Sequence, residues 1–289
     1  MSAAWLLLAA SALPAPAQPA EDRSLPAAAW AALQVKHHEI ADFNRRCGRL
    51  DPIKDADERW ADPCRTLAAA DLAGLLLDKD VPREGVRIVG ARVADALDLT
   101  AAEIEHEVSI TGSRLDGGVG LSRAVLDGRL MLDGTRIGGL FDGRRLRAKS
   151  DLLIRYGADA QRQIVLVDAR IDGNLDLEGS HFEKPLNADR VVVAGSLFMN
   201  NHARFDSDIF IHYAAIGGNL ELETSAFGAG VKAEGLKVSH HLFMVNATFK
   251  QAVIIPYAHI SGNLDLSGGS FTRIDLGEAA IGQTLILRG

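Results

Sequence analysis

ARIDGNLDLEGSHF, residues 169–182, contains the pattern that decides the fold. A small residue, any residue and a large apolar residue occur in it twice, first as Ala169-x-Ile171 and then, 11 positions later, as Ser180-x-Phe182. Only the first triplet is followed by an L-x-L tail, so the complete repeat is about 22 residues long. The tail returns at steps of 22, 23, 22 and 22 residues, as GSLFM after Val193, GNLEL after Ile216, HHLFM after Val238 and GNLDL after Ile260.

This repeat predicts stacked strands. The L-x-L tail alternates with a period of two and Gly interrupts the chain every few residues, which excludes a helical repeat. In parallel coils each interior position repeats its own side chain at a spacing of about 4.8 Å. We therefore predict an all-β solenoid, a parallel β-helix of about 22 residues per coil, over residues 85–289, with a one-residue irregularity between Gly138 and Gln163. The leucines expected in one interior file are Leu175, Leu197, Leu220, Leu242 and Leu264.

Residues 1–20 are typical of a signal peptide. An apolar run from Ala3 to Leu13 is too short to span a bilayer and precedes Ala15-Pro16-Ala17, a cleavage site of the A-x-A kind. No Lys or Arg precedes the run, so an uncleaved or misread start is the alternative. We predict a periplasmic or secreted protein without a transmembrane span, because no later stretch has the roughly 18–20 apolar residues that a spanning helix needs.

Residues 21–84 predict a small helical cap. A first helix begins near Pro26, shows apolar residues at helical spacing and ends at Gly48. A second helix extends from about Pro63 to Leu77.

Cys47 and Cys64 are the only cysteines. In an oxidising compartment such a pair forms a disulfide, and the alternative is two buried free thiols. The geometry decides between these outcomes, and the sequence does not contain it.

The composition excludes several functional classes. A formal net charge of -7 gives no basic stripe to hold phosphates, so we expect no nucleic-acid partner. Gly118 and Gly120 begin a dinucleotide-like pattern, but Arg123 stands where its third Gly is needed. The chain has no Walker loop, Ser nucleophile elbow or HExxH motif. We therefore predict no catalytic residue, no metal site and no cofactor, and we lean against an enzyme.

The small-x-[Ile/Phe] steps resemble the repeat of the pentapeptide-repeat proteins, which implies a right-handed, four-sided β-helix. The match is partial, because the regular period of five residues is lost and only the spacing of 11 residues is kept. The helical segment followed by GVRIVGARVADALDL and by ARIDGNLDLEGSHF is more similar to a group of uncharacterised bacterial right-handed β-helix proteins. Some members are labelled membrane-associated oxidoreductase, but no cofactor motif here supports that activity. The resemblance covers nearly all of the mature chain.

An outward column of acids and aromatics is the candidate binding face. It is the middle position of L-x-L in successive coils, and it alternates as Asp176, Phe198, Glu221, Phe243 and Asp265. The acids then lie about 9.6 Å apart, twice the strand spacing, which fits an exposed ladder that avoids like-charge repulsion. It also fits a groove for a sugar chain or a partner segment. Beside it, Asn174, Ser196, Asn219, His241 and Asn263 predict a ladder of turn-capping hydrogen bonds.

These patterns lead to two main hypotheses of function, and a third, a duplex mimic that acts on a DNA enzyme, is disfavoured by the signal peptide and by a net charge of only -7. The first is a non-catalytic exported scaffold or binding module of the bacterial envelope, whose partner is a protein or a glycan. The alternative is a carbohydrate-active β-helix enzyme that uses the Asp176, Glu221 and Asp265 face, since about 9.6 Å is at the wide end of the carboxylate separation of inverting glycosidases. The sequence stops at Gly289 inside an L-x-L strand, which predicts either a fragment of a longer protein or self-association through an uncapped coil.

Overall fold

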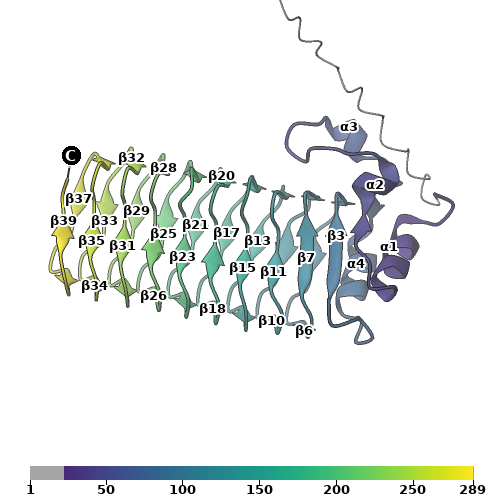
Figure 1. Cartoon of the computed structure of the whole chain (residues 1–289), viewed down its shortest axis with the longest axis horizontal. Helices are drawn as coiled ribbons and strands as arrows, with labels where there is room; N and C mark the ends of the chain where they lie inside the picture. Colours follow the sequence, from purple (N-terminus) through teal and green to yellow (C-terminus); the bar gives the residue numbers. More distant parts are fainter. Residues whose placement is uncertain (1–22, 289) are drawn as a thin grey trace, which may run out of the picture.

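The structure, a computed structural model, describes residues 23–288, so the predicted signal peptide lies outside the described residues. These residues form a rod with a helical cap at its N-terminal end (Figure 1). Each coil contributes four short strands, one to each of four parallel sheets that we name A to D in chain order. The chain passes from sheet A at the front of Figure 1 over the top, down the back and along the bottom, which is the right-handed winding of the predicted parallel β-helix.

Sheets A and B contain 11 and 10 strands. Sheet A comprises β1 (Ala41–Asp42), β3 (Val86–Val89), β7 (Val108–Thr111), β11 (Leu130–Met131), β15 (Leu152–Leu153), β19 (Leu175–Asp176), β23 (Leu197–Phe198), β27 (Leu220–Glu221), β31 (Leu242–Phe243), β35 (Leu264–Asp265) and β39 (Leu285–Ile286). Sheet B comprises β2 (Thr66–Leu67), β4 (Arg92–Val93), β8 (Arg114–Leu115), β12 (Arg136–Ile137), β16 (Asp159–Ala160), β20 (His181–Phe182), β24 (Arg204–Phe205), β28 (Ala226–Phe227), β32 (Thr248–Phe249) and β36 (Ser270–Phe271).

Sheets C and D contain nine strands each. Sheet C comprises β5 (Leu97–Asp98), β9 (Val119–Gly120), β13 (Phe141–Asp142), β17 (Ile164–Val165), β21 (Leu186–Asn187), β25 (Ile209–Phe210), β29 (Val231–Lys232), β33 (Val253–Ile254) and β37 (Ile274–Asp275). Sheet D comprises β6 (Glu103–Ile104), β10 (Val125–Leu126), β14 (Arg147–Ala148), β18 (Arg170–Ile171), β22 (Val192–Val193), β26 (Ala215–Ile216), β30 (Lys237–Val238), β34 (His259–Ile260) and β38 (Ala280–Ile281).

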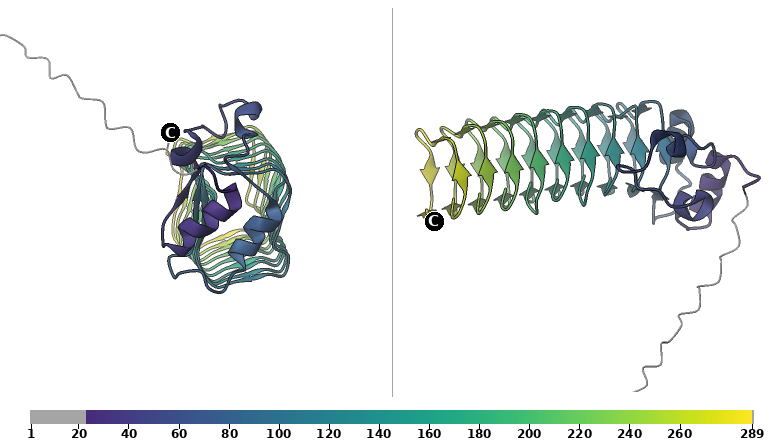
Figure 2. Two further views of the ribbon diagram at one scale, coloured as in Figure 1. Left: turned by 90° about the vertical axis from the view of Figure 1, so that its right-hand side faces the viewer. Right: turned by 90° about the horizontal axis from the view of Figure 1, so that it is seen from above.

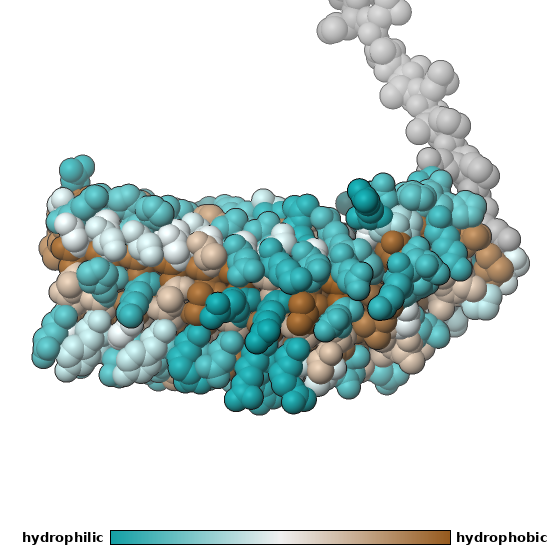
Figure 3. Space-filling model, turned by 90° about the horizontal axis from the view of Figure 1, so that it is seen from below, coloured by the Kyte–Doolittle hydropathy of each residue, from teal (hydrophilic) through white to brown (hydrophobic). Residues whose placement is uncertain are grey.

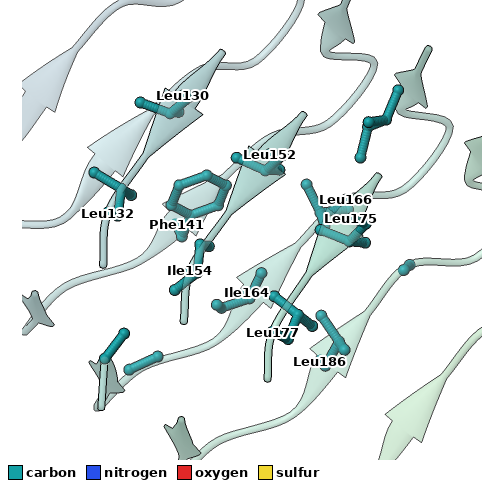
Figure 4. Packing of buried hydrophobic residues seen from close by; sticks show 14 of the residues in the cluster. Leu130, Leu132, Phe141, Leu152, Ile154, Ile164, Leu166, Leu175, Leu177 and Leu186 are labelled. Atoms are coloured by element: carbon teal, nitrogen blue, oxygen red, sulfur yellow. The ribbon is translucent and has the colours of Figure 1, made fainter. Parts of the chain in front are cut away.

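The interior consists of files of equivalent side chains, as the repeat predicts. In sheet A the five leucines from Leu175 to Leu264 pair in direct register, and each is at most 1% exposed. Figure 4 shows the same arrangement in neighbouring coils, where Leu130, Leu152 and Leu175 follow one another on adjacent strands. On sheet B, Phe182, Phe205, Phe227, Phe249 and Phe271 form a stack with ring centroids 4.6–5.3 Å apart.

The predicted irregularity is one extra residue at the corner between sheets A and B. Strand β16 begins six residues after Leu153, whereas β12 begins five residues after Met131. The extra residue lies in the Tyr156–Gly157 turn, where both residues have positive φ. A second one lies at Asn201–His202, also with positive φ. The turns absorb the inserted residues, so the strands on both sides keep their register.

The cap differs from the prediction of two helices. It contains α1 (Ala27–Lys36), α2 (Phe43–Cys47), α3 (Asp57–Trp60) and α4 (Ala69–Leu76). The first predicted helix is interrupted because β1 pairs with β3, and β2 likewise precedes α4 and pairs with β4. The pairing covers the strand edges that the first coil would otherwise expose. Figure 2 shows α1 and α4 lying across the open end of the rod.

Two further contacts hold the cap together. Cys47 and Cys64 form a disulfide, which closes a loop with a sequence separation of 17. Arg114 of sheet B is buried beneath the α3 segment, where it donates to the Pro52 and Asp55 carbonyl oxygens at 2.7 Å and contacts Asp57. The guanidinium groups of Arg65 and Arg114 both lie 5.0 Å from the ring of Trp60.

Candidate functional site

The predicted column of acids and aromatics lies on the outer surface of sheet A. Asp176, Phe198, Glu221, Phe243 and Asp265 are direct partners on successive strands, each between two inward residues. The adjacent polar ladder forms the predicted hydrogen bonds. Each of its side chains accepts a bond from the backbone N–H of the next coil, at 2.8–3.2 Å, from Asn174 through Ser196, Asn219, His241 and Asn263.

Asp176 departs from the prediction of an exposed ladder, because it is only 6% exposed. Its carboxylate lies 3.0 Å from the Arg155 guanidinium and accepts the backbone N–H of Glu178 at 3.1 Å. Arg155 also pairs with Asp133 at 3.2 Å. Burial raises the pKa of Asp176, while the bond from the Glu178 N–H and Arg155 act in the opposite direction. Asp176 is thus a buried ion-pair partner of Arg155.

Glu221 is held by two amides. The side-chain amides of Asn200 and Asn219 donate to its two oxygens at 3.0 and 3.1 Å. Glu223, at the following corner, has one oxygen that is buried without a hydrogen-bond partner, and burial raises the pKa of this carboxyl. The middle of the column is therefore a partly exposed strip of carboxylate and amide groups between the Phe198 and Phe243 rings.

A second cluster, on the outer surface of sheet B, escaped the sequence analysis. His181 lies between two carboxylates, with Nδ1 2.8 Å from Asp159 and Nε2 2.9 Å from Asp206. Burial lowers the pKa of His181, but the hydrogen bonds to Asp206 and Asp159 outweigh it and raise the pKa above its ordinary value. Glu183 completes a set in which the ligand atoms of Asp159, His181 and Glu183 all lie within 4.8 Å of one another.

The sequence contains the spacing that brings this cluster together, but the repeat pattern does not mark the triplet that holds Asp159. Asp159 and His181 are outward residues of paired strands, 22 positions apart. The period of 22 aligns Asp159 with His181, but the triplet around Asp159 is Ala158-x-Ala160, which lacks the large apolar third residue of the repeat. The inserted residue also shifts this triplet by one position relative to the preceding coil.

A third feature is a group of arginines on sheet D and at the corner between sheets C and D. Ser122, Arg123, Arg144, Arg145, Val167 and Asp168 line a hollow of about 410 Å³. Arg144 pairs with Asp142, but Arg123 and Arg145 make no ion pair within residues 23–288.

The neighbouring surface of sheet D also carries arginines, since Arg147 and Arg170 are direct partners on β14 and β18. Figure 3 views the rod from below, the side of sheet D, and shows long hydrophilic side chains along the lower edge of its middle part. Locally this surface is basic, although the chain as a whole is acidic.

Comparisons with protein-family models, with curated proteins and with solved structures gave no match. The resemblance to pentapeptide-repeat proteins and to bacterial β-helix proteins therefore stays a prediction. Of the helices between residues 23 and 288, none is both long and apolar enough to cross a bilayer.

Proposed function

We propose that this protein is a non-catalytic, exported scaffold of the bacterial envelope that binds an extended glycan along sheet A. The observation that carries the proposal is the strip at Phe198, Glu221 and Phe243. Two partly exposed rings lie two strands apart, about 9.6 Å, and flank a carboxylate whose oxygens are fixed by amides. Aromatic faces with fixed hydrogen-bonding groups between them suit a polymer of ring-shaped polar units.

The packing of the rod supports a lateral binding surface. The interior is filled by files of apolar side chains, so a ligand has to lie on the outside. Strands of the same sheet repeat their outward positions at one spacing along the rod, so a linear polymer parallel to the axis meets equivalent groups at every second coil.

The roles of the acids also favour binding over the enzyme alternative. Asp176 is engaged by Arg155, and Glu221 by Asn200 and Asn219. An inverting glycosidase needs one carboxyl group free to protonate the leaving group and another free to activate water. The Asp176 and Glu221 carboxylates are both engaged by neighbouring side chains, so neither is free for these two roles.

A binding experiment tests the proposal. Purified neutral and acidic envelope polysaccharides are titrated against the immobilised full chain. We expect saturable binding of at least one of them, weakened about tenfold or more by the double change Phe198→Ala and Phe243→Ala, since each aromatic contact contributes about 0.5–1.5 kcal/mol beyond its buried area. Phe210→Ala, an outward Phe on sheet C, is the matched control and should keep full affinity.

Three results would overturn the proposal, two from the binding measurements and one from an activity assay. The first two are that no polysaccharide binds the wild-type chain, and that the double variant binds as tightly as the control. The third is the release of reducing ends from a polysaccharide, abolished by Asp176→Asn or Glu221→Gln, which would establish the enzyme alternative.

A further inference from the structure

His181 differs from a histidine in an ordinary surface ion pair, because each of its two ring nitrogens contacts a separate carboxylate. Nδ1 faces Asp159, which is 6% exposed, and Nε2 faces Asp206. Asp206 is fixed in turn by Arg204, whose Nε and Nη2 contact its two oxygens at 2.7 and 3.2 Å. This chain of contacts holds the imidazole plane on the outer surface of sheet B.

The same arrangement orients metal-binding histidines in proteins. A ligating His donates its other N–H to a carboxylate, which fixes the tautomer and strengthens the ligand. Here Asp206 is suited to accept the Nε2–H, which leaves the Nδ1 lone pair directed toward Asp159. A metal ion would take the place of the proton that Nδ1 otherwise shares with Asp159.

The spacing of the donor atoms fits a single ion. Metal–ligand bonds of about 2.0–2.2 Å place two ligands of one zinc ion no more than about 4.4 Å apart. The donors of Asp159, His181 and Glu183 already lie within 4.8 Å of one another, so small side-chain rotations are sufficient. Gln161 bonds the other oxygen of Asp159 at 3.1 Å and leaves Oδ1 for the site.

The charges around the site favour a divalent cation. Asp159 and Glu183 provide two negative charges, and the charge of Arg204 is offset by Asp206. Arg136 neighbours Asp159 in register, but its guanidinium contacts Asp57 of the cap at 3.1 Å. His181 and Glu183 are partly exposed, so an ion and a water molecule can reach them.

We propose that Asp159, His181 and Glu183 bind one transition-metal ion of the zinc type. One nitrogen and two carboxylate oxygens form a three-ligand set that keeps a fourth position for water. Asp206 is a positioning residue that acts through His181. The site lies on sheet B, separate from the glycan strip on sheet A, and does not depend on the function proposed there.

The test uses the full chain after treatment with a chelator. Zn²⁺ is titrated by calorimetry, and Co²⁺ serves as a spectroscopic probe, because its visible absorption reports a nitrogen- and oxygen-ligated low-coordinate site. We expect one equivalent to bind, a higher melting temperature with Zn²⁺, and little competition from Mg²⁺, which prefers oxygen ligands. His181→Ala should abolish the Co²⁺ spectrum, and Glu183→Gln should weaken binding at least about tenfold, the loss typical of a group at a metal site.

His212 provides a matched control. It forms a similar pair with Asp189, Nδ1 to carboxylate 2.7 Å, but it does not belong to the three-residue set around His181. His212→Ala should therefore keep the stoichiometry and the Co²⁺ spectrum. If His181→Ala does not fold, Glu183→Gln, at a partly exposed corner residue, gives the answer alone. The proposal is wrong if Zn²⁺ does not bind, or if His181→Ala or Glu183→Gln binds it as the wild type does.

Discussion

Glu223 lies at the corner between sheets A and B, with one carboxylate oxygen buried and unpartnered. Burial raises its pKa from the ordinary value of 4.5, and the nearby Glu221 acts in the same direction, whereas the Asn200 amide opposes the change. The folded chain therefore binds the proton of Glu223 more tightly than the unfolded chain does. Well below pH 4.5 both states are protonated and the residue has no effect on stability. As the pH rises through the unfolded and then the folded pKa, stability is lost.

The change Glu223→Gln removes this loss, because Gln does not ionise. We expect the variant to melt at a higher temperature than the wild type at pH 7, and the difference to vanish near pH 4. Thermal melts at both pH values measure it. Glu105→Gln, at an exposed carboxylate, is the control and should show no such pH-dependent difference. An equal difference at pH 4 and pH 7 would contradict the assignment.

Corner residues show what a sequence can reveal at this scale. At the corner between sheets A and B, Gly and Asn take the left-handed conformation in most coils, while Tyr156, His202 and Thr224 are exceptions. The Gly and Asn residues include Gly134, Gly179, Asn201, Asn246 and Gly268. The corner between sheets C and D needs the same conformation, and there only Asp168 and Gly235 are of the types that adopt it readily. Most other coils place an Arg or a Tyr at this position, namely Arg123, Arg145, Arg190, Tyr213 and Tyr257. Neither Arg nor Tyr signals a left-handed turn in the sequence, because the stacked coil imposes the conformation against local preference.

At the scale of elements, the phenylalanine stack is a contact that five successive coils repeat in the core. Phe205 is 1% exposed and stacks on both Phe182 and Phe227, with centroids 4.7 and 5.3 Å away. Replacing it by Ala leaves a cavity closed above and below by two rigid rings, which the strands on either side prevent from collapsing. We expect Phe205→Ala to lower the free energy of unfolding by about 3–5 kcal/mol.

Denaturant unfolding measures this loss. Phe210→Ala removes the same side chain from the outer surface of sheet C, where Lys232 lies 4.7 Å from the ring centroid, and should cost about 1 kcal/mol or less. Equal losses in the two variants would contradict the expectation that the buried Phe205 ring stabilises the rod more than the outward Phe210 ring does.

At the scale of the whole molecule, the two ends of the rod differ. The cap covers the first coil, whereas the last described coil exposes the free edges of β36 to β39. Phe271, Ile274 and Ile281 are only partly buried there, and Leu285 and Leu287 are 42% and 68% exposed. Unpaired strand edges beside apolar side chains favour pairing with another chain. Either a further coil beyond Gly289 covers this edge, or the edge pairs with that of a second copy. Residues 1–289 tested by themselves are expected to take the second course.

Sedimentation equilibrium at micromolar concentration tests the association. We expect a dimer, and a monomer after the double change Leu285→Lys and Leu287→Lys, since two charges would have to be buried in the contact. Leu140→Lys, at a leucine that is 42% exposed on the side of the rod, should leave the dimer intact. A wild-type chain that stays monomeric at tens of micromolar would contradict the association.

The sequence by itself determined the solenoid, its repeat and its inward files, because a period of two inside a period of 22 residues has only one compact arrangement, in which like side chains stack on like. It also placed the column from Asp176 to Asp265, since register follows from the repeat.

Only the tertiary structure decided the details that depend on contacts between coils. The predicted helix from Pro26 to Gly48 is interrupted because a free sheet edge pairs with β1, an interaction that no local pattern contains. Asp176 is buried because Arg155, from the preceding coil, folds over it. His181 lies between Asp159 and Asp206 because β20 pairs with β16 on one side and with β24 on the other. In each case the partner is distant in sequence, and folding the chain is what brings the groups together.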